Sequence, residues 1–454
     1  MASYDETSQN LNRLSATSIL RMLLTYCISS LSYGRSTICN TSTNCAKGPL
    51  ILLLKKRKLH IMKYTAGDEI LRCEPFAHVV LPGFDICDWC LKKSEELTKC
   101  KRCELAKYCS SECVDIAWKE GHREECKLMK KSAESMPTGM SLLMARIALK
   151  LKRSEEEKRN ARYYTVLLPN KSQRRFIDLM THYEPTRSDK DKMASFDKHH
   201  DEVSKYLGDI YPTISKHPRD ELFMIYCKLL INSFGIDGDE DISSRVGKGL
   251  YLEASVFDHS CWPNAVWVFS GKTLYIRAIT DIGKFEDVRI NYTWAVNIPR
   301  EMRRSVLKRV WYFDCHCSEC TFQTFGSRRR EDLKANQETI PMLPEAVGGD
   351  NNKWVSALET SFDNHFEDKE WHKAFMVGCV ILDFYNCLLP PYSITKACVA
   401  LNVSLSAFEL GRHDESKNYM RLAEDQLRVT HGTDHKFYKE VLMPLSDIVM
   451  SAEL

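Results

Sequence analysis

Eight residues between Cys87 and Cys126 have the types and spacing of zinc ligands. They occur as Cys87-x2-Cys90, Cys100-x2-Cys103, Cys109-x3-Cys113 and His122-x3-Cys126. Zinc favours closed tetrahedral sites of thiolate and imidazole ligands, and such closed sites are structural rather than catalytic. The interleaved order predicts a cross-brace, in which the first and third pairs hold one ion and the second and fourth hold the other. So small a module is expected to fold because metal binding supplies its folding free energy.

A second cysteine cluster, Cys315-x-Cys317-x2-Cys320, is one ligand short of a complete site. The best fourth donor is Cys261, which lies far upstream in the segment DHSCWPN. With this assignment eleven cysteines and His122 form three zinc sites of four ligands each. We interpret the other eight cysteines as small buried hydrophobic residues, namely Cys27, Cys39, Cys45, Cys73, Cys227, Cys379, Cys387 and Cys398.

Composition limits the remaining classes of function. The chain has 454 residues with 64 Lys and Arg against 61 Asp and Glu, so its net charge gives no reason to expect broad binding to nucleic acid or to an anionic membrane. The CxxC pairs indicate metal binding in a reducing compartment rather than a disulfide framework. Residues 17–32 are moderately apolar, but Arg21 interrupts them and they are too few to span a bilayer, so we expect no membrane association.

The metal ligands and the segments between them must be positioned by strands and helices. Residues 62–81 predict short strands around a turn at Gly67, and residues 127–235 look mainly helical, with a buried helix over residues 221–234. The runs AVWVF and TLYIRAI alternate near period two around Gly271, which predicts a β-hairpin. Residues 300–311 predict a helix.

The C-terminal part predicts helices only, after a polar linker from Gly326 to Glu338. Apolar residues at three- and four-residue steps from Ile394 to Phe408 form one helical face that ends at Gly411, and Asp414 opens a second helix that closes near Gly432. Two antiparallel helices with a short turn are typical of a helical repeat, but a plain helical bundle fits the same pattern.

Taken together, these motifs resemble a known family. The first cluster resembles a MYND zinc finger, while DHSCWPN, the later RINY and the CHCSEC tail resemble the core and post-SET segment of a SET domain. RVTHG and its flanking helices resemble the C-terminal domain of the SET-and-MYND lysine methyltransferase family. The resemblance covers residues 62–445.

The resemblance implies an α+β multidomain fold: a SET β-fold split by the MYND finger and a helical insert, then a post-SET zinc segment and a C-terminal α-helical domain like tetratricopeptide repeats. The implied domains are an N-terminal extension that is partly disordered (1–49), the first part of the SET domain (50–86), the finger (87–126), the helical insert (127–220), the SET core (221–298), the post-SET segment (299–325) and the C-terminal domain (340–454).

The resemblance also implies methyl transfer from S-adenosylmethionine to a lysine amine. Tyr292 matches the tyrosine whose hydroxyl lies near the transferred methyl, and Asn232, Asp258, His259, Trp311 and Phe313 match positions around the cofactor and the lysine channel. Asn232 at the end of its helix could equally be a polar cap. The lysine amine must lose a proton although its reference pKa is about 10.4, and an apolar channel disfavours its charged form.

Three departures from the family pattern are visible. Asp258 stands where the family has Asn, and a carboxylate accepts hydrogen bonds but cannot donate them. Trp311 stands where the family has Tyr, which would narrow or reshape the lysine channel. The family's glycine-rich cofactor strand is not recognisable at Lys55–Leu59, which contains no glycine. A catalytically weak or inactive adaptor that binds partners through the finger and the C-terminal helices is therefore the alternative function.

The family pattern suggests the expected partners and location. The substrate would be a protein lysine, on a histone tail in chromatin regulation or on a cytosolic protein, and the protein would be a monomer in nucleus and cytoplasm. A proline-containing peptide is a candidate ligand of the finger. Residues 87–131 contain eleven Lys and Arg against nine Asp and Glu, so we expect little DNA binding.

Overall fold

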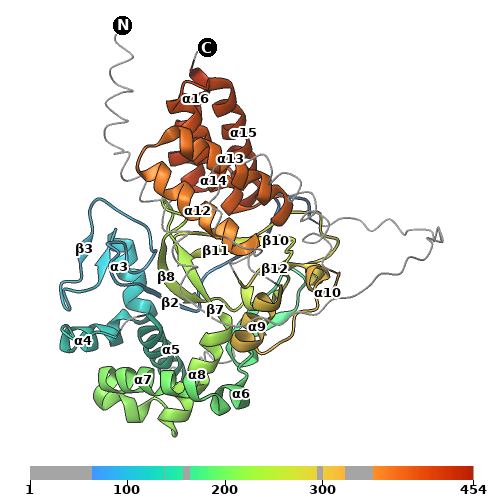
Figure 1. Ribbon diagram of the computed structural model, residues 1–454. Helices are drawn as coiled ribbons and strands as arrows, with labels where there is room; N and C mark the ends of the chain where they lie inside the picture. The colour runs from blue at the N-terminus through green and yellow to red at the C-terminus, as the bar shows by residue number, and fades with distance from the viewer. Residues whose placement is uncertain (1–63, 138, 157–163, 294–299, 323–350, 453–454) are drawn as a thin grey trace, which may run out of the picture.

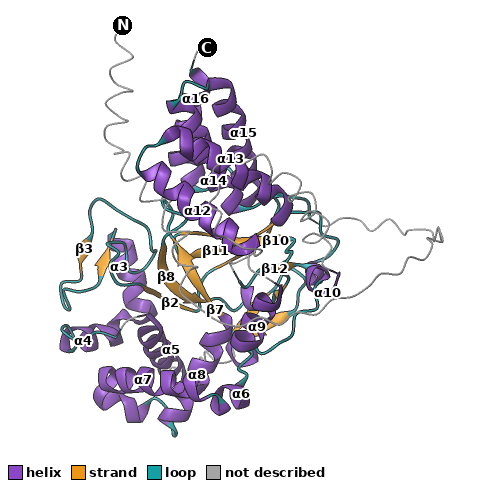
Figure 2. Ribbon diagram, viewed as in Figure 1, coloured by secondary structure: helices purple, strands orange, loops and turns teal. Residues whose placement is uncertain are grey.

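The computed structural model describes residues 64–137, 139–156, 164–293, 300–322 and 351–452, without the side chains of 322, 351–354 and 387. The predicted N-terminal extension, the segment Lys55–Leu59 and the linker Gly326–Glu338 lie outside these residues. In the described part, strands at the centre separate three groups of helices (Figures 1 and 2). This arrangement confirms the predicted α+β multidomain architecture.

Two antiparallel sheets form the centre of the molecule. The first has the order β1-β11-β10, with β1 at Glu69–Cys73, β11 at Thr273–Ala278 and β10 at Ala265–Ser270. The second has the order β2-β8-β7, with β2 at Ala77–Val80, β8 at Arg245–Leu250 and β7 at Ser233–Asp237.

The predicted hairpin is β10–β11. Gly271 has φ +55° at its turn, a conformation that glycine adopts without a steric cost. Two short strands, β9 at Asp258–His259 and β12 at Arg289–Ile290, pair in parallel. They bring the DHSC and RINY segments side by side.

The zinc-finger segment lies at one side of the strands (Figure 1). It contains the short strands β3 (Thr98–Lys99) and β4 (Lys107–Tyr108) and the helices α3 (Ser111–Ala117) and α4 (Arg123–Lys131). A π-helical turn at Trp118–His122 joins α3 to α4, and Gly121 there has φ +155°.

The helices that follow the finger are α5 (Gly139–Glu156), α6 (Tyr183–Ser188), α7 (Lys190–Leu207) and α8 (Pro218–Asn232). Two of them pack against the second sheet, with α5 on β2 and β8 and α8 on β7. The helix predicted over residues 221–234 was wrong at its end, because the chain leaves α8 after Asn232 and Ser233 already pairs with Leu250 in the sheet. This segment also contains a small hairpin that its sequence pattern does not predict, formed by β5 (Thr165–Leu167) and β6 (Gln173–Arg175).

The C-terminal helices pack against the β10–β11 hairpin. The predicted helix over residues 300–311 is α9 (Arg300–Trp311), followed by α10 (Ser318–Phe322). The last group comprises α12 (Asn351–Glu367), α13 (Trp371–Leu388), α14 (Ile394–Glu409), α15 (His413–Thr430) and α16 (Met443–Ser451). Gly411, with φ +71°, lies between α14 and α15, so the predicted helix pair is confirmed. Within the described residues, no helix is both long and apolar enough to cross a membrane.

A row of cations on α5 attaches the finger to the rest of the molecule. Arg146, Lys150 and Arg153 lie three or four positions apart, and therefore on one helical face. Arg146 pairs with buried Glu125 of α4 at 2.9 Å, and also donates to the His78 carbonyl on β2 at 2.7 Å. Lys150 donates to the Phe76 carbonyl at 2.7 Å. The same helix face therefore binds both the finger and the strand segment that precedes it.

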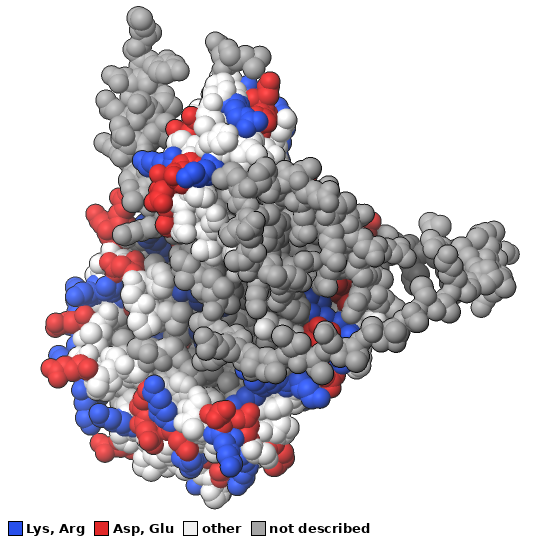
Figure 3. Space-filling view, in the orientation of Figure 1, with Lys and Arg blue, Asp and Glu red and all other residues white. Residues whose placement is uncertain are grey.

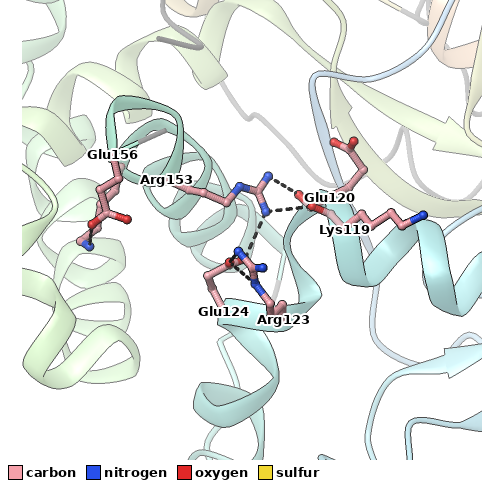
Figure 4. A network of polar contacts seen from close by, with 7 residues as sticks. Lys119, Glu120, Arg123, Glu124, Arg153 and Glu156 are labelled. Carbon is pink, nitrogen blue, oxygen red and sulfur yellow. Dashed lines mark hydrogen bonds and ion pairs between the residues drawn. The ribbon is translucent and has the colours of Figure 1, made fainter. Parts of the chain in front are cut away.

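Arg153, the last cation of this row, contacts the π-helical turn between α3 and α4 (Figure 4). Its guanidinium donates to the carbonyl of Glu120 at 2.7 Å and to that of Lys119 at 3.3 Å, and it pairs with Glu124 at 3.1 Å. The backbone carbonyls around the π-helical turn thereby find partners outside the finger.

Candidate functional site: three zinc centres and one cavity

The finger brings its eight predicted ligands together in two groups of four. One group is Cys87, Cys90, Cys109 and Cys113, and the other is Cys100, Cys103, His122 and Cys126. Within each group all ligand atoms lie within 4.8 Å of one another. These are the groups that the interleaved spacing predicts, and the thiolate-rich donor set suits zinc.

Local structure explains how the spacing works. Ser110 caps α3, because its hydroxyl accepts the Cys113 backbone N–H at 3.2 Å, and the turn places Cys109 and Cys113 on the same side. A hydrogen bond from Cys90 lowers the pKa of Cys87 to about 4, which favours the thiolate that a metal requires. Burial lowers the pKa of His122, so its imidazole is neutral and able to ligate.

The third predicted zinc centre is formed by residues far apart in the sequence. Cys261 lies with Cys315, Cys317 and Cys320, and their four sulfur atoms are within 4.8 Å of one another. Cys261 follows β9, whereas the other three follow α9. Ligation here therefore fastens the segment after α9 onto the DHSC segment.

The other described cysteines fit the interpretation as core residues. Cys73 and Cys227 are buried and Cys379 and Cys398 are partly buried, and none of these four belongs to a metal group of the described residues. Cys27, Cys39 and Cys45, and the side chain of Cys387, lie outside the described part of the chain.

A cavity of about 1070 Å³ lies beside the second sheet. It is lined by residues from α8, β7, β8, β9 and the segments that follow β12 and α9. All six residues that the resemblance assigns to the cofactor and the lysine channel line it, namely Asn232, Asp258, His259, Tyr292, Trp311 and Phe313. The fold therefore gathers these residues around one space.

Tyr292 is fixed within this cavity by both its backbone and its hydroxyl. The hydroxyl donates to the Phe257 carbonyl at 2.6 Å, and the backbone N–H donates to His259 Nδ1 at 3.0 Å. Burial, reinforced by Asp258, raises the pKa of Tyr292, so the phenol stays neutral. Its ring lies 5.4 Å from the Trp311 ring and 6.3 Å from the Phe313 ring, between centroids.

His259 connects the cavity to the third zinc centre. Its Nε2 lies 3.2 Å from the sulfur of Cys261, and its Nδ1 accepts the Tyr292 N–H. Burial lowers the pKa of His259 to about 4, so the ring is neutral. The zinc ligand Cys261 and the tyrosine are thus joined through one imidazole.

Asn232 and Trp311 form polar contacts with the cavity wall. The Asn232 amide donates to the carbonyls of Met180 and Lys228, at 2.9 and 2.8 Å, so it ties the end of α8 to the segment after β6. These bonds support the interpretation of Asn232 as a polar cap of α8, and its place in the cavity lining supports its interpretation as a cofactor residue. The Trp311 indole donates to the Ile231 carbonyl at 3.3 Å. Asp258 is exposed at the cavity edge.

Sequence reasoning missed three cationic residues that line the same cavity: Arg174, Arg245 and Lys248. Arg174 comes from the unpredicted β5–β6 hairpin and donates to the Ser255 hydroxyl at 3.1 Å. Arg245 and Lys248 flank Gly247 in the run RVGKGL. A lysine between two glycines, shortly before the DHSC segment, was the available signal.

Comparison with known proteins agrees with this geometry. The MYND finger family model matches residues 87–126. The histone-lysine N-methyltransferase SMYD3 of Homo sapiens is 26% identical over 418 residues, which cover 84% of this chain and 92% of that protein. The N-lysine methyltransferase SMYD2 of Homo sapiens is 25% identical, covering 84% and 93%. SMYD2-B of Danio rerio is 23% identical, covering 87% and 96%.

The chain is similar to SET and MYND domain-containing lysine methyltransferases over most of its length, and it carries a MYND finger. These relatives are lysine methyltransferases by name, and each match covers more than four fifths of this chain. The similarity to this methyltransferase family rests on the finger and on coverage of most of the chain, and the three cysteine-rich groups agree with it.

Proposed function

We propose that this protein is an S-adenosylmethionine-dependent protein-lysine N-methyltransferase. The observation that carries the proposal is the assembly of six residues from separate segments around one cavity, with the Tyr292 hydroxyl anchored on the Phe257 carbonyl. Most of the rate of a methyl transfer comes from positioning, and a phenol held at both ends is a positioned group.

The lining of the cavity suits the charges of the cofactor. S-adenosylmethionine carries a sulfonium, an ammonium and a carboxylate. Aromatic rings at Tyr292, Trp311 and Phe313 can face a cation, and the Asp258 carboxylate at the edge can accept from an ammonium. Arg174, fixed on Ser255, offers a donor for a carboxylate. The described residues therefore fit the cofactor.

The cofactor, when bound, supplies a methyl group on a positively charged sulfur. The chain's own residues orient the lysine and keep its amine neutral. The aromatic and apolar walls disfavour an ammonium through desolvation. Tyr292 remains a neutral phenol because burial raises its pKa, so it orients groups by hydrogen bonding and does not serve as a base. Its hydroxyl hydrogen is already donated to the Phe257 carbonyl, which leaves the oxygen lone pairs facing the cavity.

The substrate, partners and location extend the proposal. We propose a histone tail or a cytosolic protein as substrate, a monomer acting in nucleus and cytoplasm, and a proline-containing peptide as ligand of the finger. On the face in Figure 3, blue and red side chains are interspersed over the lower helices. This mixture supports the expectation that the chain binds DNA little, because affinity for nucleic acid depends on clustered positive charge.

Transfer of a labelled methyl group from S-adenosylmethionine to histones and to cell lysate tests the proposal. We expect incorporation by the wild-type chain and a loss of roughly a hundredfold for Tyr292→Phe, since one positioned hydrogen-bonding group is removed. A Tyr275→Phe variant, altered on β11 outside the cavity, is the matched control. No incorporation by the wild type would overturn the proposal.

Calorimetry with S-adenosylmethionine separates the enzyme from the adaptor. The enzyme requires binding by the full chain, with Tyr292→Phe binding nearly as well as wild type. An absence of binding would favour the adaptor, in which the finger and the C-terminal helices hold partners.

A further inference from the structure

Arg245 and Lys248 place positive charge on one wall of the cavity. Both belong to β8, and Lys248 pairs in register with Gly235 on β7, which also lines the cavity. A side chain at Gly235 would stand 2.1 Å from the Arg245 Cδ atom. The glycine therefore leaves the space that the Arg245 side chain occupies.

Arg245 is held in place by its own sheet. Its Nε lies 3.2 Å from Asp237 Oδ1 on the neighbouring strand, and 43% of its side chain is exposed. Burial raises the pKa of Asp237 to about 6, against the opposing effect of Arg245. Arg245 lines the cavity and Asp237 does not.

Lys248 has no such partner. Its ammonium makes no hydrogen bond or ion pair with any residue in the described part of the chain. Burial, and then Arg245, lower the pKa of Lys248, which shows that its charge lacks compensation. Among the described lining residues Asp258 carries the one carboxylate, and it lies with His259 on β9.

The position of Lys248 separates it from the predicted cofactor residues. The neighbouring wall is formed by Leu81, whose N–H donates to the Val246 carbonyl at 2.8 Å, and by Gly139 at the start of α5. His259, Tyr292 and Phe313 instead form one aromatic group, with ring centroids 5.3 to 6.3 Å apart. The uncompensated cation therefore comes from β8, whereas the aromatic group comes from β9 and the segments after β12 and α9.

We propose that Arg245 and Lys248 bind a carboxylate that the protein substrate carries close to its target lysine. The inference rests on the proposed function, and it names the substrate class: lysines flanked by Asp or Glu. An acidic flank would compensate Lys248, while the two cations disfavour an ammonium at the target position and so favour the neutral, reactive amine.

Paired peptides test this selectivity directly. Short peptides with a single lysine carry Glu or Gln at each flanking position in turn, and their binding to the full chain is measured by fluorescence anisotropy, with and without S-adenosylhomocysteine. We expect the Glu peptide to bind roughly tenfold more tightly at one or two positions, as for a hydrogen bond between charged groups. The preference should weaken with added salt.

Variants of Lys248 assign the effect to its charge. Lys248→Gln should bring the Glu and Gln peptides to within about threefold of each other, and Lys248→Glu should favour a Lys flank instead. Lys248→Arg is the conservative control that keeps the preference. Thermal melting shows whether each variant is folded, and Lys152→Gln, a partly exposed residue of α5 outside the cavity lining, controls for net charge.

Two results would overturn the inference. Equal affinity for the Glu and Gln peptides at every flanking position would show that the two cations bind no substrate carboxylate. A Lys248→Gln effect confined to S-adenosylmethionine affinity, measured by calorimetry, would assign the cation to the cofactor carboxylate instead. Failure of the wild-type chain to transfer methyl groups would count against the proposed function alone, because the peptide measurement requires no transfer.

Discussion

The zinc finger and the cavity assemble their functional residues in different ways. The finger takes all eight ligands from residues 87–126, and two ligand pairs come together to form each of its two metal groups. The cavity takes its lining from strands and helices spread between Leu81 and Phe313. The finger therefore depends on local spacing and metal, whereas the cavity depends on packing between elements that are distant in sequence.

The third zinc centre combines the two modes. Cys315, Cys317 and Cys320 are spaced like finger ligands, but Cys261 comes from the DHSC segment of the cavity wall. Because His259 bridges Cys261 and Tyr292, this metal centre supports the cavity as well as its own segment. Zinc binding in the finger therefore stabilises one segment, whereas zinc binding at the third centre also supports the cavity wall.

Replacing one ligand in each kind of centre gives the largest expected effect. Cys100→Ser should remove one zinc ion of three and unfold the finger, since metal binding supplies about 10 kcal/mol or more in such modules. Cofactor binding should persist. Cys261→Ser should also remove one ion. It should weaken S-adenosylmethionine binding as well, because His259 loses its contact with the Cys261 sulfur and no longer holds its position in the cavity wall. Metal analysis by mass spectrometry, hydrogen exchange of residues 87–126 and calorimetry measure these outcomes.

A Cys73→Ser variant, altered at a buried cysteine outside every described metal group, is the control for thiol loss. If Cys100→Ser abolished cofactor binding as fully as Cys261→Ser does, the separation between finger and cavity would be wrong.

Breaking the α5 attachment should cost less than losing a zinc ion. Arg146→Met leaves Glu125 buried without its partner, at 5% side-chain exposure, and removes the bond to the His78 carbonyl. We expect a loss of about 3 kcal/mol in the free energy of unfolding, as for other buried pairs broken on one side. Urea unfolding measures it, with all three zinc ions retained.

Lys152→Ala is the matched control on the same helix, because its pair with Glu156 is exposed and should contribute at most about 0.5 kcal/mol. An equal loss in both variants would show that α5 responds to any charge removal and that its buried face has no special role.

The same contrast explains what the sequence could predict. The finger ligands could be grouped because their four regularly spaced pairs alternate along the chain between the two metal groups. Cys261 could be assigned because the other three ligands of its site require a fourth. The hairpin around Gly271 followed from its alternation. The end of α8 could not be placed, because apolar Phe234 follows Asn232 and Ser233 and extends the helical pattern, whereas pairing with β8 decides where the helix stops.

The cavity was predicted only in part for a related reason. Tyr292 and His259 stand in recognisable motifs, but Arg174 reaches the cavity from a short hairpin of polar residues that has no strong pattern. Lys248 faces the cavity because of its strand register opposite Gly235, and register is a tertiary property.

A pH titration extends the comparison to the C-terminal helices, for which the described residues show no metal group. His435 donates from Nε2 to the Phe269 carbonyl at 2.6 Å, and its Nδ1 accepts the Phe437 N–H at 3.1 Å. Burial lowers the pKa of His435 and that of His431, whose ring centroid lies 4.7 Å away. Asp239, Arg277 and Lys92 are the charged groups that act on His435.

Because these folded-state pKa values lie below the unfolded value of about 6.5, the unfolded state takes up protons first as the pH falls. Stability from this contact should therefore be complete above about pH 7 and should decline below about pH 6.5, by about 1 kcal/mol per pH unit for each histidine. Urea unfolding at several pH values measures the slope. His435→Gln keeps a donor for the Phe269 carbonyl but cannot titrate, so it should reduce the slope of stability against pH. An unchanged slope would show that other groups cause the pH dependence.

The smallest effect is expected at Trp311, where the cavity departs from the family pattern. Trp311→Phe removes the 3.3 Å bond to the Ile231 carbonyl, which should cost less than about 1 kcal/mol in stability. It also removes ring volume beside Tyr292, so a lysine that already carries a methyl group gains room to turn its amine for another transfer. We expect more di- and trimethyllysine in the product, measured by mass spectrometry, while Trp371→Phe in α13 leaves the distribution unchanged. If both variants gave the wild-type distribution, the width of the channel would be set by Tyr292 and Phe313, and the indole would serve to pack α9 against α8.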